Sequence, residues 1–258
     1  MAIRVNTTGP VATVTLARPA LHNAFDPLLI EALRRAFESL ATDQAVRVVV
    51  LAGDGPSFCA GADLNWMRDS LAYTVEENHQ DALRLADMLD AIASCPHPVI
   101  ARVHGAALGG GAGLVAACDI AVATPEARFG FTEARLGLAP AVISPYVLAR
   151  IGPGHARALF LTAERFDAAR AFAIGLVHRV VPSADLDSAV EDVVRQLLAA
   201  GPEALRACKA LAQLVPAMPL DEARGYTAAL IARLRTGAEG QEGIRAFLEK
   251  RPPAWKAD

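Results

Sequence analysis

The chain has 258 residues, of which 53% are hydrophobic, 21% charged and only 5% aromatic. This length and apolar fraction favour one large domain, or a domain with an appendage, around a sizeable aliphatic core. The formal net charge of -3 provides no basic excess for binding a phosphate backbone, so we expect no nucleic-acid partner.

The cysteines and the apolar segments indicate a reduced, cytoplasmic protein without a membrane segment. No two cysteines form a CxxC pair, so we expect no disulfide framework, and we interpret Cys59 and Cys118 as small core residues. The first ten residues lack the apolar core of a signal peptide. The longest apolar stretch, residues 103–118, includes His104 and several glycines and is too short to cross a bilayer, which favours a buried element.

The chain opens with a predicted hairpin and a helix. Two β-branched runs, Ile3–Thr7 and Val11–Leu16, flank a Gly-Pro pair, as is typical of a hairpin. Asp26 is a candidate N-cap and Pro27 fits the first turn of a helix that should run to about residue 41.

Strands and helices then alternate. Val46–Leu51 is a continuous apolar run, as in a buried parallel strand, and Gly53–Asn65 is expected to be a loop. Apolar residues at helical spacing predict a long helix from about Glu76 to Ser94. The next expected elements are a strand, a helix and a strand: Val99–Val103, Gly109–Ala117 and Asp119–Ala123. This alternation predicts an α/β fold of right-handed β-α-β units with a parallel sheet.

The C-terminal part of the pattern is helical throughout. Four helices are expected there, over residues 184–200, 202–214, 221–235 and 238–249. We therefore divide the chain into a core, residues 1–182, and a C-terminal helical region, residues 183–258. Because these helices no longer alternate with strands, we expect them to cover the active site and a neighbouring subunit.

Two glycine-containing segments are suited to binding an anion through the backbone. Ser57–Leu64 follows a predicted strand, and its small residues would let free N–H groups approach a developing oxyanion. His104–Gly113 brings three consecutive glycines to the start of an apolar helix, whose first N–H groups are unpaired. An ordinary loop and close helix–sheet packing, respectively, would explain the same residues.

A third segment, Phe129–Pro140, places Glu133 in mostly apolar surroundings. A carboxyl group there can have a raised pKa and act as a general acid or base. A single glutamate is more often a solvated surface residue. Only the combination with the other two segments supports a catalytic role for Glu133.

In this order and spacing, the three segments resemble the crotonase (enoyl-CoA hydratase/isomerase) superfamily. The resemblance covers essentially the whole chain, from Arg18–Phe25 to Glu242–Arg251. It implies a crotonase-type ββα spiral core with a helical C-terminal region, assembled as a homotrimer or a dimer of trimers.

The resemblance also implies the functional residues. The N–H groups of Ala62 and Gly110 would hold the thioester oxygen as it becomes enolate-like, with Glu133 as the catalytic acid or base. Coenzyme A, as part of an acyl-CoA substrate, would contact seven positions: His22, Ala24, Ala60, Asp63, Leu64, Phe247 and Lys250. No separate cofactor is implied, and the histidines have no metal-ligand spacing, so we expect no metal.

One position departs from the pattern of many hydratases in this superfamily. These carry two catalytic glutamates, of which the later matches Glu133 and the earlier falls at Gly113. Glu133 alone would then deliver a proton and activate water in turn. Isomerisation, which needs one base to move a proton, becomes more credible.

Residues 62–67, 138–146 and 238–243 sharpen the resemblance toward the bacterial methylglutaconyl-CoA hydratases of leucine breakdown. We therefore expect an enoyl-CoA hydratase with 3-methylglutaconyl-CoA as the first-choice substrate. An enoyl-CoA delta-isomerase on the same scaffold is the alternative, and a non-catalytic RNA-binding protein is less favoured because of the acidic charge balance.

Five further side chains each have two readings. Arg135 could bind a distal substrate carboxylate, but a surface or structural salt bridge is slightly favoured. His104 is better interpreted as a hydrogen-bonded structural histidine than as a base. Trp66, Met67 and Tyr73 could line an acyl pocket or provide ordinary packing on a loop.

Overall fold

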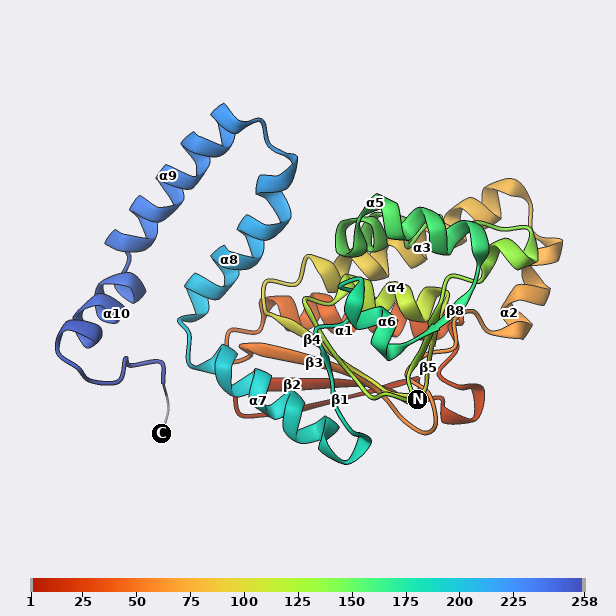
Figure 1. Cartoon of the computed structure of the whole chain (residues 1–258), viewed down its shortest axis with the longest axis horizontal. Helices are drawn as coiled ribbons and strands as arrows, with labels where there is room; N and C mark the ends of the chain where they lie inside the picture. The colour runs from red at the N-terminus through yellow and green to blue at the C-terminus, as the bar shows by residue number, and fades with distance from the viewer. Residues whose placement is uncertain (1, 257–258) are drawn as a thin grey trace.

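The computed structural model describes residues 2–256 and contains a six-stranded sheet in the order β1-β2-β3-β4-β6-β9 (Figure 1). β1 and β2 pair antiparallel, and every other neighbour pair in this sheet is parallel. The predicted N-terminal hairpin is confirmed, with Gly9 at φ 56 in its turn. The strands are β1 Ile3–Thr8, β2 Val11–Leu16, β3 Val48–Gly53, β4 Val99–Val103, β6 Ile120–Ala123 and β9 Arg179–Val180.

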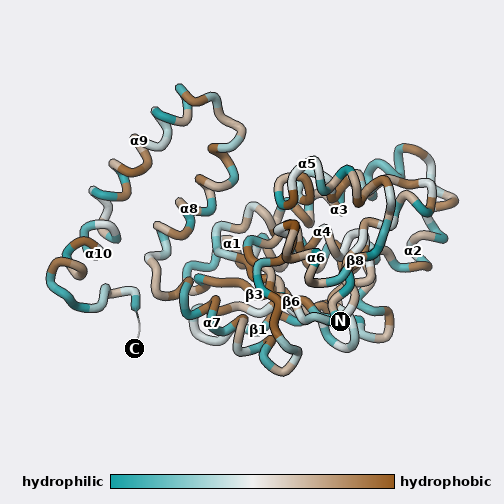
Figure 2. The backbone as a smooth tube through the Cα atoms, in the orientation of Figure 1, coloured by the Kyte–Doolittle hydropathy of each residue, from teal (hydrophilic) through white to brown (hydrophobic). Residues whose placement is uncertain are grey.

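Helices cover both faces of this sheet. The helices on one face are α1 Pro27–Thr42, α3 Val75–Ala93, α4 Gly110–Ala117 and α5 Ser144–Thr162, while α7 Leu186–Leu198 lies on the other (Figure 1). Alternate residues of β3 enter different cores: Val49 and Leu51 pack on the first group, and Val48 and Val50 pack with α7. Burial on both faces explains why β3 is apolar along its length, and Figure 2 shows hydrophobic residues concentrated in β3 and β6.

A smaller three-stranded sheet adjoins the first and was not predicted. Its strands are β5 Ala106–Leu108, β7 Arg128–Gly130 and β8 Arg165–Asp167, with β5 and β7 parallel and β7 and β8 antiparallel. The aromatic rings of Phe129 and Phe166 stack at 5.8 Å between centroids and hold β7 to β8. Two short helices complete this region: α2 Leu64–Asp69 and α6 Ala168–Ala173.

Three helices at the C-terminal end form an arm that projects from the sheet region (Figure 1). They are α8 Pro202–Leu214, α9 Leu220–Thr236 and α10 Ala238–Leu248. Lys209 attaches α8 to the core through Asp119, with 2.7 Å between Nζ and Oδ2. Within residues 2–256, no helix is long and apolar enough to span a membrane. The division of the chain at residue 183 stays a prediction.

Candidate active site

The loop Cys59–Ala62 is held between two segments distant in sequence. On one side, the backbone N–H of Phe25 donates to Gly61 O at 2.7 Å, and the N–H of Asp63 donates to Phe25 O at 2.8 Å. On the other side, Cys59 forms a parallel bridge with Ala107 of β5. These bonds use the backbone groups flanking Ala62, and no acceptor within residues 2–256 pairs with the Ala62 N–H itself. This N–H is therefore available to a ligand.

The first residue of α4 provides a second available donor. Gly109, at φ 52, turns the chain from β5 into α4, a conformation that favours glycine. The N–H of Gly110 has no acceptor in its own helix and none elsewhere in the described part of the chain. A Cβ on Gly110 would lie 2.6 Å from Cε2 of Phe25, so close packing also requires glycine here. The partial positive charge at the start of α4 favours an anion at this point.

Glu133 lies beside this helix start. It begins a short 3-10 helix, Glu133–Leu136, and its Oε1 is 3.1 Å from where a Cβ on Gly109 would stand. Oε2 is buried and has no hydrogen-bond partner among the described residues. Burial raises the pKa of this carboxyl above that of an ordinary glutamate. A protonatable group therefore stands beside the glycine turn that leads into the Gly110 donor.

The residues expected to contact coenzyme A divide into two groups. The loop at His22–Ala24 meets the loop at Ala60–Leu64: the Ala60 N–H donates to His22 O at 3.0 Å, and His22 Nδ1 lies 2.9 Å from Ser57 Oγ. Asp63 is buried and Leu64 is exposed at the start of α2. The structure thus brings together His22, Ala24, Ala60, Asp63 and Leu64.

Phe247 and Lys250 are not part of this cluster within one chain. Phe247 lies in α10, where it is 82% exposed, and Lys250 follows the end of that helix at φ 56. Figure 1 places α10 at the opposite end of the molecule from α2. Any contact of these two residues with the site would therefore need a second copy of the chain.

Structural roles account for several other side chains that sequence reasoning considered. His104 Nε2 lies 2.8 Å from Gly55 O, as expected for a hydrogen-bonded histidine. Trp66 donates from Nε1 to Asp81 Oδ2 at 2.7 Å and so fixes α2 to α3. The salt bridge favoured for Arg135 is absent: Arg135 is exposed, and no ion pair joins it to another described residue. Cys59 and Cys118 are fully buried, and burial raises the pKa of each thiol to about 12.

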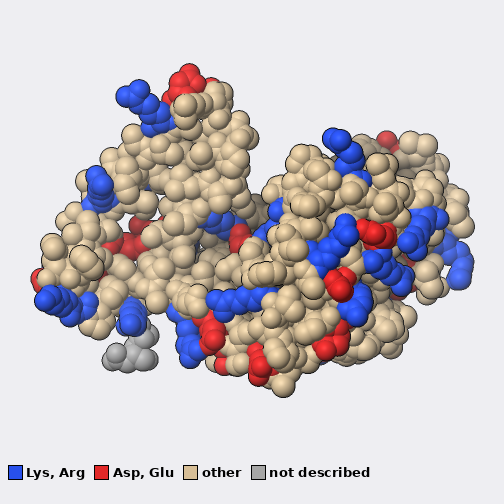
Figure 3. All heavy atoms as spheres, in the orientation of Figure 1, with Lys and Arg blue, Asp and Glu red and all other residues tan. Residues whose placement is uncertain are grey.

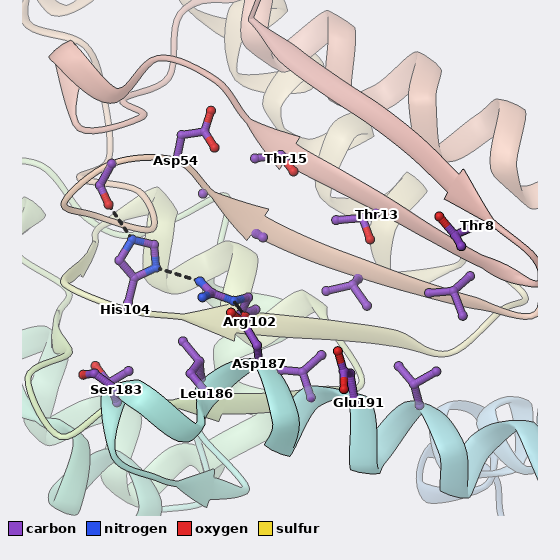
Figure 4. Close-up of a pocket in the computed structure, with 18 of the residues that line it drawn as sticks. Thr8, Thr13, Thr15, Asp54, Arg102, His104, Ser183, Leu186, Asp187 and Glu191 are labelled. Carbon is purple, nitrogen blue, oxygen red and sulfur yellow. Dashed lines mark hydrogen bonds and ion pairs between the residues drawn. The ribbon is translucent and has the colours of Figure 1, made fainter.

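A large groove lies away from these residues, between α7 and the face of the six-stranded sheet that α7 covers. It has a volume of about 1010 Å³, and Figure 4 shows Thr13, Arg102, His104 and Asp187 on its walls. Arg102 and Asp187 form an ion pair across it at 2.5 Å. None of the predicted site residues lines this groove.

The family assignment follows from comparison with known proteins. The sequence model of the Enoyl-CoA hydratase/isomerase family matches residues 6–258. The chain belongs to this family, the crotonase superfamily. A crotonyl-CoA hydratase of Syntrophomonas wolfei is 33% identical over 243 residues, covering 93% of this chain and 92% of that protein.

Solved structures show the crotonase fold. An enoyl-CoA hydratase from Shewanella pealeana is 39% identical, with a TM-score of 0.95 over 99% of this chain and 96% of that one. A Legionella pneumophila structure assigned to the enoyl-CoA hydratase/isomerase (crotonase) class is 45% identical, with a TM-score of 0.93 over 99% of both chains. The predicted α/β crotonase fold with a helical C-terminal region is confirmed.

Sequence reasoning missed the side chain that fills the space beside Gly113 in this crotonase. A Cβ at Gly113 would stand 2.3 Å from Cγ2 of Ile143 and 2.8 Å from its Cβ. A glutamate therefore cannot be placed at position 113 without moving Ile143. No local pattern in the sequence signals this contact, because the two residues are far apart in the chain. Glu133 Oε1 lies beside Gly109, the residue before the Gly110 donor, and Oε2 has no hydrogen-bond partner among the described residues.

Proposed function

We propose that this protein is an enoyl-CoA hydratase, which adds water reversibly across the C2=C3 bond of a 2-enoyl-CoA thioester. The observation that carries the proposal is the pair of unpaired backbone donors, Ala62 and Gly110, with the buried carboxyl of Glu133 beside the second. The hydratase names of the relatives support it.

In the proposed reaction, the thioester oxygen accepts hydrogen bonds from Ala62 and Gly110. Negative charge moves onto this oxygen as the water oxygen bonds to C3, so the two donors stabilise the enolate-like state more than the ground state. Each such donor contributes about 3 kcal/mol. The ionised Glu133 accepts the proton that the water loses, and the resulting carboxyl then delivers a proton to C2. Its raised pKa suits both roles.

The first-choice acyl group is 3-methylglutaconyl, which carries a distal carboxylate. The resemblance of residues 62–67, 138–146 and 238–243 to the methylglutaconyl-CoA hydratases supports this choice. Arg135 is the candidate partner for the carboxylate, because it is exposed two residues after Glu133. Comparing kcat/KM for methylglutaconyl-CoA and crotonyl-CoA tests the choice. A preference for crotonyl-CoA would contradict it.

Loss of the absorbance of the conjugated thioester tests the reaction itself. Purified protein should consume a 2-enoyl-CoA, and Glu133→Gln should reduce kcat by at least about a hundredfold because no carboxylate remains to move protons. Glu38→Gln, on the exposed side of α1, is the matched control and should retain the parent rate. A Glu133→Gln enzyme with full activity would contradict the role of Glu133.

The packing of Ile143 at Gly113 favours a second candidate, an enoyl-CoA isomerase. A site with one carboxylate can move a proton from C2 to C4 of a 3-enoyl-CoA, which shifts the double bond to C2=C3 without adding water. Reaction in water enriched in heavy oxygen separates the two activities, since only hydration introduces solvent oxygen into the product. Isomerised product without the label would favour the isomerase.

We also propose that the chain assembles as a homotrimer or a dimer of trimers. The projecting arm exposes several large apolar side chains that a second copy could cover: Leu220, Ile231, Ile244, Phe247 and Leu248. An RNA-binding role has less support, since the face in Figure 3 shows basic and acidic residues interspersed. Salt-sensitive RNA binding by the purified protein would restore that alternative.

A further inference from the structure

One arginine joins the start of two helices near the candidate site. Nη2 of Arg18 lies 2.9 Å from Oδ2 of Asp26 and 3.0 Å from Oδ2 of Asp63. These two aspartates are the N-caps of α1 and α2: Asp26 Oδ1 accepts from the Leu29 N–H at 2.7 Å, and Asp63 Oδ1 accepts from the Asn65 N–H at 2.8 Å. Each carboxylate therefore uses one oxygen for its helix and the other for Arg18.

The same guanidinium also holds the segment that bridges to Ala62. Nη1 of Arg18 donates to Ala24 O at 2.6 Å, immediately before Phe25. Phe25 pairs with Ala62 through the parallel bridge, while its ring lies where a Cβ on Gly110 would clash. Phe25 thus lies next to both proposed oxyanion donors. Arg18 binds the residues on either side of it, Ala24 and Asp26.

The arginine is enclosed, which makes its geometry restrictive. Its side chain is 18% exposed and that of Asp63 only 6%, so solvent screens the pair weakly. The planar guanidinium donates in fixed directions to Ala24 O and Asp63 Oδ2 and pairs with Asp26, whereas a lysine ammonium cannot reproduce that fork. The backbone N–H of Arg18 is also held, by Oδ1 of the fully buried Asn23 at 2.9 Å.

From these contacts we propose that Arg18 is a positioning residue for the oxyanion hole. By joining the N-caps of α1 and α2, it holds the Phe25–Ala62 bridge so that the Ala62 N–H points toward the same ligand oxygen as the Gly110 N–H. The inference rests on the proposed hydratase function. It assigns Arg18 no contact with the substrate and no role in proton transfer.

The test uses Arg18→Lys and Asp63→Asn in the full-length protein. Asp63→Asn keeps an oxygen for the α2 cap and removes only the charge that Arg18 binds. We expect kcat to fall about tenfold to a hundredfold in each variant with little change in KM, because the lost alignment matters most in the transition state. The kcat of the double variant should be little lower than that of the less active single variant, because both substitutions disrupt the same Arg18–Asp63 interaction.

A spectroscopic readout separates positioning from a merely structural role. A bound 2,4-dienoyl-CoA should absorb at longer wavelength when the two N–H groups polarise its carbonyl, and this red shift should shrink in both variants. Arg102→Gln, which breaks the Arg102–Asp187 pair on the other face of the sheet, is the matched control and should leave kcat and the red shift unchanged.

The outcomes distinguish this inference from the proposed function. A parent protein that neither hydrates nor isomerises enoyl-CoA would contradict the function, whatever the variants do. An active parent whose folded Arg18→Lys and Asp63→Asn variants keep the parent kcat per folded molecule and the parent red shift would overturn the role of Arg18. Thermal denaturation supplies the folded fraction for each variant.

Discussion

At the scale of single residues, the burial of Glu133 couples catalysis to stability. Because burial raises the pKa of this carboxyl, the folded state binds its proton more tightly than the unfolded state does. Its contribution to stability is therefore full below the unfolded-state pKa and is lost as pH rises through the folded-state pKa. Once the carboxyl is ionised in the folded state, the buried and partly unpaired carboxylate is a cost to the fold.

Replacing this carboxyl should consequently stabilise the inactive enzyme. We expect Glu133→Gln to raise Tm by a few degrees near pH 8 and to lose most of that advantage toward pH 4, where the unfolded-state carboxyl also becomes largely protonated. Thermal denaturation from pH 4 to 8, with Glu38→Gln as the reference, measures the difference. An advantage that grows toward acid pH would contradict the raised pKa.

The contact between Gly113 and Ile143 makes a second prediction at this scale. Gly113→Ala places a Cβ within 2.3 Å of Ile143 Cγ2, and overpacking of this kind costs about 1–3 kcal/mol of unfolding free energy. Gly154→Ala, in α5, is the matched control, because its new Cβ would have nothing within 4 Å. Urea unfolding compares them, and equal stabilities would show that Ile143 moves aside freely.

The residues of the site were predictable to different degrees. Ala62, Gly110 and Glu133 were assigned by resemblance, because each stands in a short segment with a distinctive local pattern. The Arg18–Asp63 pair and the Ile143 contact join positions far apart in the chain. Such contacts depend on how the loops meet in space, which no local pattern specifies.

At the scale of elements, the sequence pattern predicted the central strands and most of the long helices, but not α5. The strand Val99–Val103 and the helix at 202–214 have the predicted bounds, and α3 begins at Val75 and ends at Ala93, within a residue of the prediction. The strands β5, β7 and β8 were missed because three residues carry no measurable alternation. α5 contains Gly152 at φ 74 followed by Pro153. A glycine–proline pair normally indicates the end of a helix, so the sequence does not predict a helix that continues past it.

One half-buried arginine supports the helix that carries the Gly110 donor. Arg150 of α5 donates to the carbonyls of Ala116, Cys118 and Asp119, at and just beyond the C-terminal end of α4. These are helix-end acceptors that the helix itself cannot satisfy, and a cation there also suits the helix dipole. The partial burial of Arg150 lowers the pKa of its guanidinium.

Removing this support should be costly. We expect Arg150→Met to lower the unfolding free energy by about 3 kcal/mol, because several buried carbonyls lose their donors at once. Arg102→Gln breaks a partly exposed ion pair and should cost about 0–1 kcal/mol. Urea denaturation of both variants gives the comparison. Similar losses would mean that water replaces Arg150 at the end of α4.

At the scale of the whole molecule, the arm of α8–α10 separates two groups of predicted site residues. His22, Ala60 and their neighbours lie in the core, while Phe247 and Lys250 lie at the far end of the arm (Figure 1). A single chain therefore does not bring all the predicted coenzyme A contacts together at one site. The proposed trimer would resolve this if the arm of one copy reaches the site of another.

Mixing two inactive variants tests that arrangement. Glu133→Gln retains an intact arm, and a Phe247→Ala, Lys250→Ala double variant retains an intact carboxyl, so oligomers refolded from both should contain some complete sites. We expect activity above the sum of the two separate preparations, approaching about a quarter of the parent rate in a one-to-one mixture of random partners. Light scattering should give about three or six times 27.1 kDa for the parent. Mixed oligomers with no regained activity would mean that Phe247 and Lys250 serve their own chain or none.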